Sequence, residues 1–241
     1  MKNRVIYIYH SCFLLRLGQK LFLFDYPNKE HLPEGAKDVV LKNINDNDEV
    51  FVFFSHGHED HFNPEIESVF EGREKVWYVL SDDIVDLYGD EVISSPYLVV
   101  EPDEEYEYQG ISIKTFLSND LGVAYLINSD GINIYFGGDL ASWAWPNLPD
   151  KAIEESDRLF IEVIEYLSTL KIHIGFSNVD FRLPNFGGGE EFLKKVKPKY
   201  FVPIHLFADP KRLDEFVKDL DVGETVIFKY KNTGDFLDLD L

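Results

Sequence analysis

The sequence has little of several residue types, and each shortage narrows the possibilities. Cys12 is the only cysteine among 241 residues, so no disulfide can form within the chain, which fits a reducing cytoplasm. No apolar run reaches membrane-spanning length, and no basic-then-apolar leader follows Met1. Only 23 basic residues face 44 acidic ones, so the net charge is −21. We expect a cytoplasmic protein that binds neither membranes nor nucleic acid, because its negative field repels both.

The remaining composition is that of a globular protein. Apolar residues make up 45% of the chain, which is enough for a large core. Strand-like and helix-like stretches alternate, and this pattern favours a layered α/β architecture. No charge run, low-complexity tract or long Gly/Pro/Ser-rich linker divides the chain. We expect a single domain over residues 1–241, and the sequence leaves both a monomer and a homo-oligomer open.

The most informative stretch joins a predicted strand to a predicted helix. Residues 50–54 are β-branched and aromatic, which is typical of a buried strand. Asn63 followed by Pro64 is a helix-start pattern, with Asn as the cap, and predicts a helix over residues 64–70. Between them lies the sequence Ser-His-Gly-His-Glu-Asp-His. The histidines therefore belong to a turn that follows a strand.

This turn has the composition of a metal site. His56 and His58 point the same way in an extended chain, because side-chain direction repeats every second residue. Asp60 and His61 fall where the chain turns, and can face a neighbouring point. Three imidazoles and one carboxylate on one turn suit Zn²⁺ or a similar borderline metal. A solvated histidine-rich turn is the alternative.

The pattern His-x-His-x-Asp-His after an apolar strand resembles the signature of the metallo-β-lactamase superfamily. Residues 134–139 resemble the strand that ends in the family's bridging aspartate, and residues 200–205 resemble the strand that carries its last histidine. The resemblance covers most of the chain and implies an α/β fold, a four-layer αββα sandwich with metals at one edge. Within the superfamily the chain looks most like the ascorbate-6-phosphate lactonase branch, on softer markers at residues 9–11, 24–27 and 179–183.

The resemblance implies a ligand set for one or two divalent ions, Zn or Mn. Its members are His56, His58, Asp60, His61, Asp139 and His205. For Asp139 a helix cap is the alternative. Most members have a third histidine where this chain has Ser118. Either Asp120 replaces it as an oxygen ligand, which would make the site harder and could favour Mn²⁺, or only the second site fills well.

Four further residues are expected around these ligands. Asp25 ends a strand and could hold a ligand histidine in the right tautomer, although a turn aspartate fits equally. His10 is either a turn histidine or part of the pocket wall. Asp180 and Arg182 are candidates for substrate contact, and a mutual surface ion pair is their alternative.

A metal-dependent hydrolase of the lactonase or esterase kind is the function that follows. Coordination can lower the pKa of a bound water to about 7, and the resulting metal-bound hydroxide would attack a small-molecule ester, lactone or phosphoester. Asp60 is the expected catalytic residue, because its carboxylate can orient that nucleophile. A phosphodiesterase or nuclease of the same superfamily is one alternative, and a non-catalytic metal-binding protein is the other.

Overall fold

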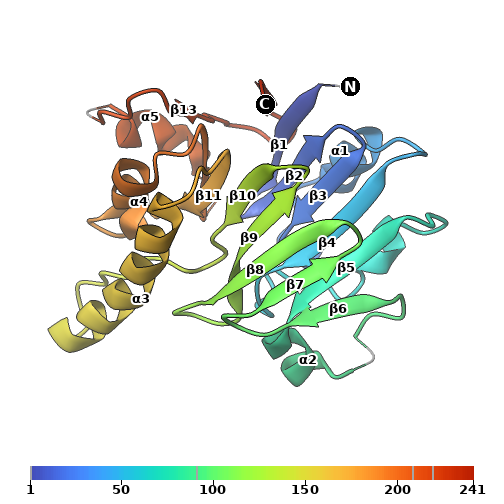
Figure 1. Ribbon diagram of the computed structural model, residues 1–241, viewed down its shortest axis with the longest axis horizontal. Helices are drawn as coiled ribbons and strands as arrows, with labels where there is room; N and C mark the ends of the chain where they lie inside the picture. Colours follow the sequence, from blue (N-terminus) through green and yellow to red (C-terminus); the bar gives the residue numbers. More distant parts are fainter. Residues whose placement is uncertain (1, 91, 208, 219) are drawn as a thin grey trace. The chain divides into compact units, whose positions relative to one another are not determined.

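The structure, a computed structural model, describes residues 2–90, 92–207, 209–218 and 220–241. It contains two compact units: unit 1 is Met1–Glu101 with Tyr230–Leu241, and unit 2 is Pro102–Lys229. Each unit has its own seven-stranded sheet and its own helices (Figure 1). The single domain over residues 1–241 stays a prediction.

The sheet of unit 1 is mixed. Its strand order is β14-β1-β2-β3-β4-β5-β6, antiparallel from β14 to β3 and parallel from β3 to β6. The antiparallel part contains the three strands nearest the N-terminus, and the strand expected at residues 50–54 lies within β4. The elements are β1 (Asn3–Tyr9), β2 (Cys12–Leu17), β3 (Lys20–Phe24), α1 (Ala36–Lys42), β4 (Glu49–Phe54), the 3₁₀ helix η1 (Ile66–Val69), β5 (Val76–Ser81), α2 (Asp82–Tyr88), β6 (Tyr97–Val100) and β14 (Phe236–Leu239).

The helix expected over residues 64–70 is wrong in type and length. Only η1 forms there, and its backbone bonds span three residues, as from Ile66 N to Asn63 O at 3.1 Å. Ile66 and Val69 are both buried in the core of unit 1. A spacing of three residues between inward-facing side chains fits the 3.0 residues per turn of a 3₁₀ helix. Asn63 is not the cap expected from the sequence, because Glu65 is the residue that precedes η1; the Asn63 side chain instead supports the turn before η1, where its Oδ1 accepts from Glu65 N at 2.8 Å.

Both faces of the central strands of unit 1 are buried. On one face, alternate residues of β1 to β4 join α1, η1 and α2 in a core of mostly aliphatic side chains, with some aromatic ones such as Phe54 and Phe62. On the other face, aromatic rings form a row in which Phe22 lies 5.3 Å from Phe51 and Phe51 lies 5.1 Å from Trp77. Apolar residues on both faces explain why residues 50–54 are continuously apolar.

The sheet of unit 2 has the order β13-β12-β11-β10-β9-β8-β7. It is parallel from β13 to β10 and antiparallel from β10 to β7. Its elements are β7 (Glu105–Tyr108), β8 (Ile111–Leu117), β9 (Val123–Ser129), β10 (Ile132–Phe136), α3 (Asp150–Ser168), β11 (Ile174–Asn178), η2 (Phe186–Gly188), α4 (Gly189–Val196), β12 (Tyr200–Ile204), η3 (Pro210–Arg212), α5 (Leu213–Phe216) and β13 (Val226–Ile227).

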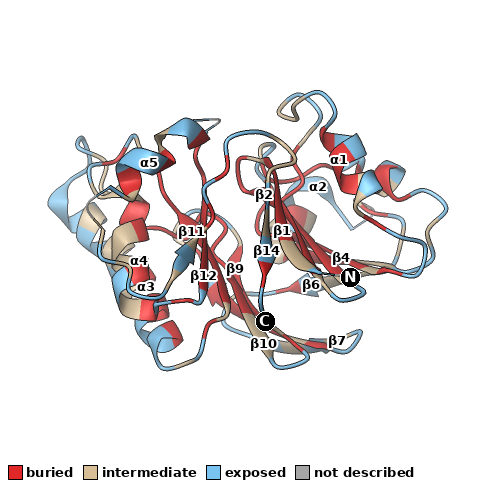
Figure 2. Ribbon diagram, turned by 90° about the horizontal axis from the view of Figure 1, so that it is seen from above, coloured by how far each residue is buried: buried red, intermediate tan, exposed pale blue. Residues whose placement is uncertain are grey.

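Aromatic packing joins α4 to the sheet of unit 2. The ring of Phe192 stacks on Tyr135 of β10 at 5.4 Å and lies 5.8 Å from Phe201 of β12. Gly175 of β11 makes room for that ring, because a Cβ at Gly175 would lie 2.9 Å from it. Figure 2 shows the helices with buried and exposed portions, whereas the central strands are mostly buried. Among the residues that the structure describes, no helix combines the length and the apolar character needed to cross a bilayer.

Candidate metal centre

Potential ligands gather at the carboxyl ends of parallel strands in both units. In unit 1, Asp25 follows β3 and the histidine turn follows β4, and these strands are parallel. In unit 2, Asp139, Asp180 and His205 follow the parallel strands β10, β11 and β12. Ligands of open α/β sheets bind outside the carboxyl ends of the strands. Each unit therefore presents its polar side chains where such a sheet binds a ligand.

Buried hydrogen bonds link four side chains of unit 1. Asp25 Oδ2 lies 2.7 Å from Nδ1 of His61 and accepts from the Ser55 hydroxyl at 2.7 Å, while Oδ1 accepts from Ser55 N at 2.7 Å. Ser55 Oγ lies 3.0 Å from Nδ1 of His56. All four residues are buried. Burial raises the pKa of Asp25, and the hydrogen bonds from His61 and Ser55 oppose that increase.

These contacts determine which nitrogen of each histidine carries a proton. An ionised carboxylate only accepts hydrogen bonds, so His61 donates from Nδ1 and the Ser55 hydroxyl donates to Asp25. Because the only proton of the Ser55 hydroxyl is donated to Asp25, Ser55 Oγ can only accept from Nδ1 of His56. The lone pair lies on Nε2 in both rings, and this is the atom that a metal binds when Nδ1–H is held by a protein oxygen.

The spacing of the nitrogens also fits a metal ion. Nε2 of His56 and Nδ1 of His58 are 3.0 Å apart. Two nitrogens at 2.0–2.1 Å from a tetrahedral Zn²⁺ would be about 3.3 Å apart. His56 is buried and His58 is exposed, so this pair opens toward solvent. The donor set of unit 1 therefore fits a divalent ion.

Sequence reasoning missed the residues that hold the histidine turn in place. Gly57 N donates to Asp83 Oδ2 at 2.8 Å, and Tyr88 donates from its hydroxyl to Gly57 O at 3.0 Å. Both partners come from α2. A Cβ at Gly57 would lie 2.7 Å from Leu87 Cδ1, so a larger residue there would displace the exposed side chain of Leu87. Nothing in the local sequence of α2 marks these contacts, because they depend on how the helix packs.

His10 and Asp60 lie beside the same turn. His10 is buried between β1 and β2, and its ring packs edge-on against His61 at 5.2 Å. Its Nε2 is 3.6 Å from Asp60 Oδ2, and Asp60 Oδ2 is 3.9 Å from Nε2 of His61. His10 therefore lies in a turn and packs against His61, one of the candidate ligands. Asp60 is partly exposed, with 30% of its side chain accessible.

The second group of candidate ligands is centred on His205 in unit 2. Its Nε2 lies 3.2 Å from Asp139 Oδ2, close to the spacing of two ligands on one tetrahedral ion. Its Nδ1 lies 3.3 Å from Asp180 Oδ2 on the other side of the ring. Asp139 and Asp180 are both buried. Asp180 therefore lies on the Nδ1 side of His205, at a longer distance than the 2.7 Å between Asp25 and His61.

Arg182 holds Asp180 in position. Arg182 Nε donates to Oδ1 and Oδ2 of Asp180 at 2.9 and 3.0 Å, and Arg182 N donates to Oδ1 at 2.8 Å. Burial alone would raise the pKa of Asp180, but its interactions with His205 and Arg182 outweigh burial and hold the pKa well below its usual range. The pair expected from the sequence is formed, but its carboxylate is buried and faces His205.

Three of these residues have strained backbones. The φ angles of His10, Asp25 and His205 are 49°, 43° and 64°. Residues other than glycine rarely adopt these left-handed backbone angles unless their surroundings enforce them, and such residues cluster at functional sites. The strain thus falls on residues that the sequence placed in or beside the site.

Two asparagines, which sequence reasoning also missed, support the loops around Asp139. Asn178 donates from Nδ2 to Gly138 O at 2.8 Å and to Leu140 O at 3.1 Å, on both sides of Asp139. Asn119 donates to Ala141 O at 2.6 Å. This contact fixes the loop that carries Asp120 beside the segment that follows Asp139. The only signal for either asparagine is its place directly after a predicted strand or beside a candidate ligand.

The sequence matches the profile of the Beta-lactamase superfamily domain over residues 4–205. The chain belongs to the beta-lactamase superfamily. No curated protein matches it. The fold is similar to that of Igni18, a metallo hydrolase of the archaeon Ignicoccus hospitalis, at 16% identity and a TM-score of 0.64 over 100% of both chains. It is also similar to that of YhfI, a metallo-beta-lactamase fold protein of Bacillus subtilis, at 14% identity and a TM-score of 0.64 over 98% of this chain and 99% of that one.

These likenesses confirm the predicted α/β fold of the metallo-β-lactamase family. A diphosphatase of the PhnP family has a similar fold, at 14% identity and a TM-score of 0.56, over 95% of this chain and 84% of that one. Identities this low speak to the fold and leave the substrate of this beta-lactamase superfamily member open.

One cavity of this superfamily member adjoins candidate ligands. It has a volume of about 400 Å³, lies in unit 2, and is lined in part by Asp120, Asp139 and His205. The structure therefore brings Asp120 to the same cavity as two expected ligands of its unit. Ser118 lies two residues before Asp120 in the chain, and Ser118 Oγ accepts a hydrogen bond from Asp120 N at 3.2 Å.

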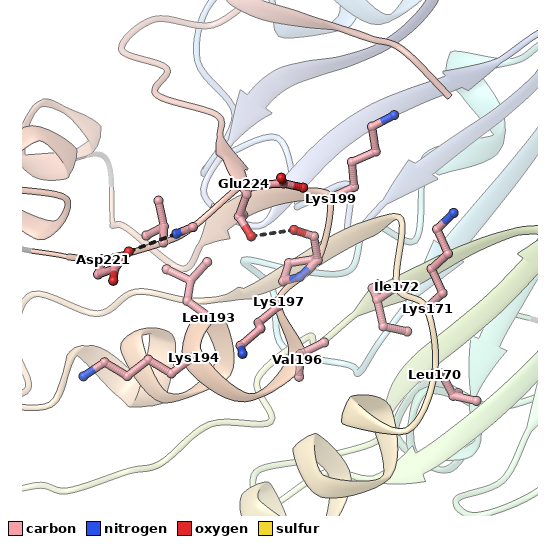
Figure 3. Close-up of a pocket in the computed structure, with 14 residues that line it drawn as sticks. Leu170, Lys171, Ile172, Leu193, Lys194, Val196, Lys197, Lys199, Asp221 and Glu224 are labelled. Atoms are coloured by element: carbon pink, nitrogen blue, oxygen red, sulfur yellow. Dashed lines mark hydrogen bonds between the residues drawn. The ribbon is translucent and has the colours of Figure 1, made fainter.

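A larger cavity of about 960 Å³ lies elsewhere in unit 2 and has a different character. Its described lining residues include four lysines and no histidine. In Figure 3 the side chains of Lys171 and Lys199 point away from those of Lys194 and Lys197. Their charges do not converge on one point, and within unit 2 the candidate ligands adjoin the smaller cavity.

Proposed function

We propose that this protein is a metal-dependent hydrolase of small-molecule esters, lactones or phosphoesters. Membership of the superfamily supports a hydrolase, and the observation that carries the proposal is the pairing of buried carboxylates with histidines. Asp25 holds Nδ1 of His61, and Asp180 faces Nδ1 of His205. Both rings therefore keep Nε2 for a metal, and such partners commonly raise the basicity of ligand histidines.

The proposed ligands are those that the sequence indicated. His56, His58, Asp60, His61, Asp139 and His205, with Asp120 in place of the missing histidine, would hold one or two divalent ions, Zn or Mn. A bound divalent ion lowers the pKa of a coordinated water to about 7 and stabilises negative charge on the attacked group.

The residues of the chain have separate tasks in this proposal. Asp25 and Ser55 fix the tautomers of His61 and His56, and their burial keeps water from competing for those hydrogen bonds. Asp60 accepts a hydrogen bond from the attacking water and so orients it. Its partial exposure allows this contact. Arg182 keeps Asp180 ionised, and Asp180 in turn orients His205.

Metal analysis with a substrate panel tests the proposal. The purified protein is expected to retain one or two Zn or Mn ions per chain and to hydrolyse at least one member of a panel of lactones, aryl esters and phosphodiesters. Chelation should abolish the turnover, and the metal should restore it. His61→Ala and His205→Ala should each lower metal content and turnover together. Metal-independent turnover, or full metal content in both variants, would overturn the proposal.

The panel includes phosphodiesters because a diphosphatase has a similar fold. The ascorbate-6-phosphate lactonase branch is likewise a prediction from soft sequence markers. A net charge of −21 favours a small substrate over nucleic acid. Turnover of a phosphodiester but of no lactone or ester would select the phosphoester branch.

A further inference from the structure

The cavity beside His205 has an aromatic and aliphatic wall, which consists of Trp143, Trp145 and Leu148. The indole rings of Trp143 and Trp145 are nearly parallel, with centroids 6.1 Å apart and planes inclined by 6°. Leu148 is 40% exposed. A wall of this kind offers apolar area to a ligand and few hydrogen bonds.

The wall is anchored to the candidate ligands. Trp143 donates from Nε1 to Asp139 O at 3.1 Å, and its ring packs edge-on against His205 at 5.3 Å. Its indole N–H is thus already used within the protein. A ligand in this cavity would contact the two indoles next to Asp139 and His205, and the bond to Asp139 O holds Trp143 in place.

The charge of the cavity does not favour an anion away from the metal. Among the described residues that line it, Arg182 is the one basic side chain, whereas Asp120 and Asp139 are acidic. The guanidinium of Arg182 binds both oxygens of Asp180. It also lies 3.7 Å from the ring centroid of Phe207 and 5.0 Å from that of Trp145. Its charge and its planar faces are therefore engaged by the protein.

Bound cations would make the cavity attractive to negative charge only next to the ions, where the reacting group lies. Divalent ions on Asp139 and His205 would attract the carbonyl or phosphoryl group that is attacked. A second anionic group, such as a phosphate at the other end of a substrate, would face the aromatic wall and pay for the loss of its hydration. The volume of about 400 Å³ lies near the lower end of ligand cavities, which limits the substrate to a small molecule.

We propose that the part of the substrate away from the scissile bond is an uncharged ring or short apolar chain that lies on Trp143, Trp145 and Leu148. This inference rests on the proposed function and narrows it to neutral lactones or esters. It separates the protein from enzymes whose substrate carries a phosphate outside the reacting group.

Binding is measured without turnover by tryptophan fluorescence. The chain has three tryptophans, and Trp77→Phe removes the one outside the wall. The probes are two five-membered lactams, one with a neutral phenyl substituent and one with a phosphate, because an unstrained lactam of this size resists hydrolysis. In metal-loaded Trp77→Phe protein the neutral lactam should quench the fluorescence and bind at least tenfold more tightly than the phosphorylated one. Equal or tighter binding of the phosphorylated lactam would overturn the inference.

Two variants test whether the wall is responsible. Leu148→Ala and Trp145→Ala should each weaken binding of the neutral lactam by about tenfold, because each variant removes apolar contact area and Trp145→Ala also removes an aromatic ring. Trp145→Phe keeps a ring and should restore most of the affinity, which shows that a loss in Trp145→Ala is not misfolding. Unchanged affinity in both alanine variants would refute the wall as the binding surface.

The same lactams distinguish this inference from the proposed function. If the neutral lactam binds through the wall but no lactone, ester or phosphodiester is hydrolysed, the hydrolase proposal fails and the binding surface stands. If phosphorylated lactones are hydrolysed faster than neutral ones, the hydrolase proposal stands and the inference fails.

Discussion

Ser55→Ala is the most direct test of the hydrogen bonds beneath the metal ligands. The Ser55 hydroxyl donates to Asp25 at 2.7 Å and lies 3.0 Å from Nδ1 of His56, and the residue is fully buried. Alanine removes both contacts. It retains the backbone bond from residue 55 N to Asp25 Oδ1, so the turn after β4 keeps its backbone support.

The size of the effect follows from the two lost contacts. A buried hydrogen bond contributes about 1 kcal/mol net, and a buried group that loses its partner costs about 1–3 kcal/mol. We expect Ser55→Ala to lower the free energy of unfolding by about 2 kcal/mol. Metal affinity should fall about 10- to 100-fold, because the tautomer of His56 is no longer fixed.

The assay pairs urea denaturation with calorimetric titration of Zn²⁺ into metal-free protein. Ser129→Ala is the matched control: Ser129 is also buried, and its hydroxyl has no hydrogen-bond partner among the described residues. That variant should change stability by less than about 1 kcal/mol and leave Zn²⁺ affinity unchanged. If Ser55→Ala binds Zn²⁺ as tightly as the wild type, the hydrogen-bond relay does not prepare His56 for a metal.

Three further changes test other parts of the structure. Arg182→Met should lower metal affinity about tenfold by freeing Asp180 beside His205, as read by the same titration. Asp48→Asn breaks the pair in which Asp48 Oδ2 accepts from Arg16 Nη2 at 2.8 Å, and should cost about 3 kcal/mol at pH 7 in urea denaturation. Burial raises the pKa of Asp48, but Arg16 and Asn45 outweigh burial and lower it. The ionised Asp48 carboxylate therefore contributes its full stabilisation above about pH 4, and this stabilisation is lost as the pH falls through the pKa of Asp48 in the folded protein. A destabilisation by Asp48→Asn that stays constant in acid would contradict this. Gly188→Ala places a Cβ 2.5 Å from Phe160 Cε1. Its control is Gly18→Ala, because Gly18 also has a positive φ but a Cβ there meets no atom within 4 Å. Thermal denaturation should show the Gly188→Ala variant to be about 1–3 kcal/mol less stable than the Gly18→Ala variant.

The sequence was sufficient for features that depend on neighbouring residues. The apolar run at residues 50–54 could only be a buried strand, and the histidines that follow it had to lie in its exit turn. The expected α/β class follows from the same alternation. The prediction failed over residues 64–70, where the tertiary need to bury Ile66 and Val69 produced a 3₁₀ turn instead of an α-helix.

Features that depend on distant contacts could not be read from the sequence. Ser55 looks like any serine until β3 brings Asp25 beside it. From the sequence, Arg182 is expected to contact substrate or to form a surface ion pair. The sequence does not show that Asp180 is buried against His205, because this contact depends on β11 and β12 being neighbours. Whether all the candidate ligands share the same ions stays a prediction.

The pairing of β14 with β1 has a consequence for synthesis of the chain. β1 is made before unit 2, and its partner at residues 236–239 is made only after the whole of unit 2. All strands of unit 2 lie in one continuous segment, whereas β1 keeps an open edge until residues 236–239 are made. A nascent chain that stalls after residue 229 would therefore expose the unpaired N–H and C=O groups of β1, a template for strand exchange between chains.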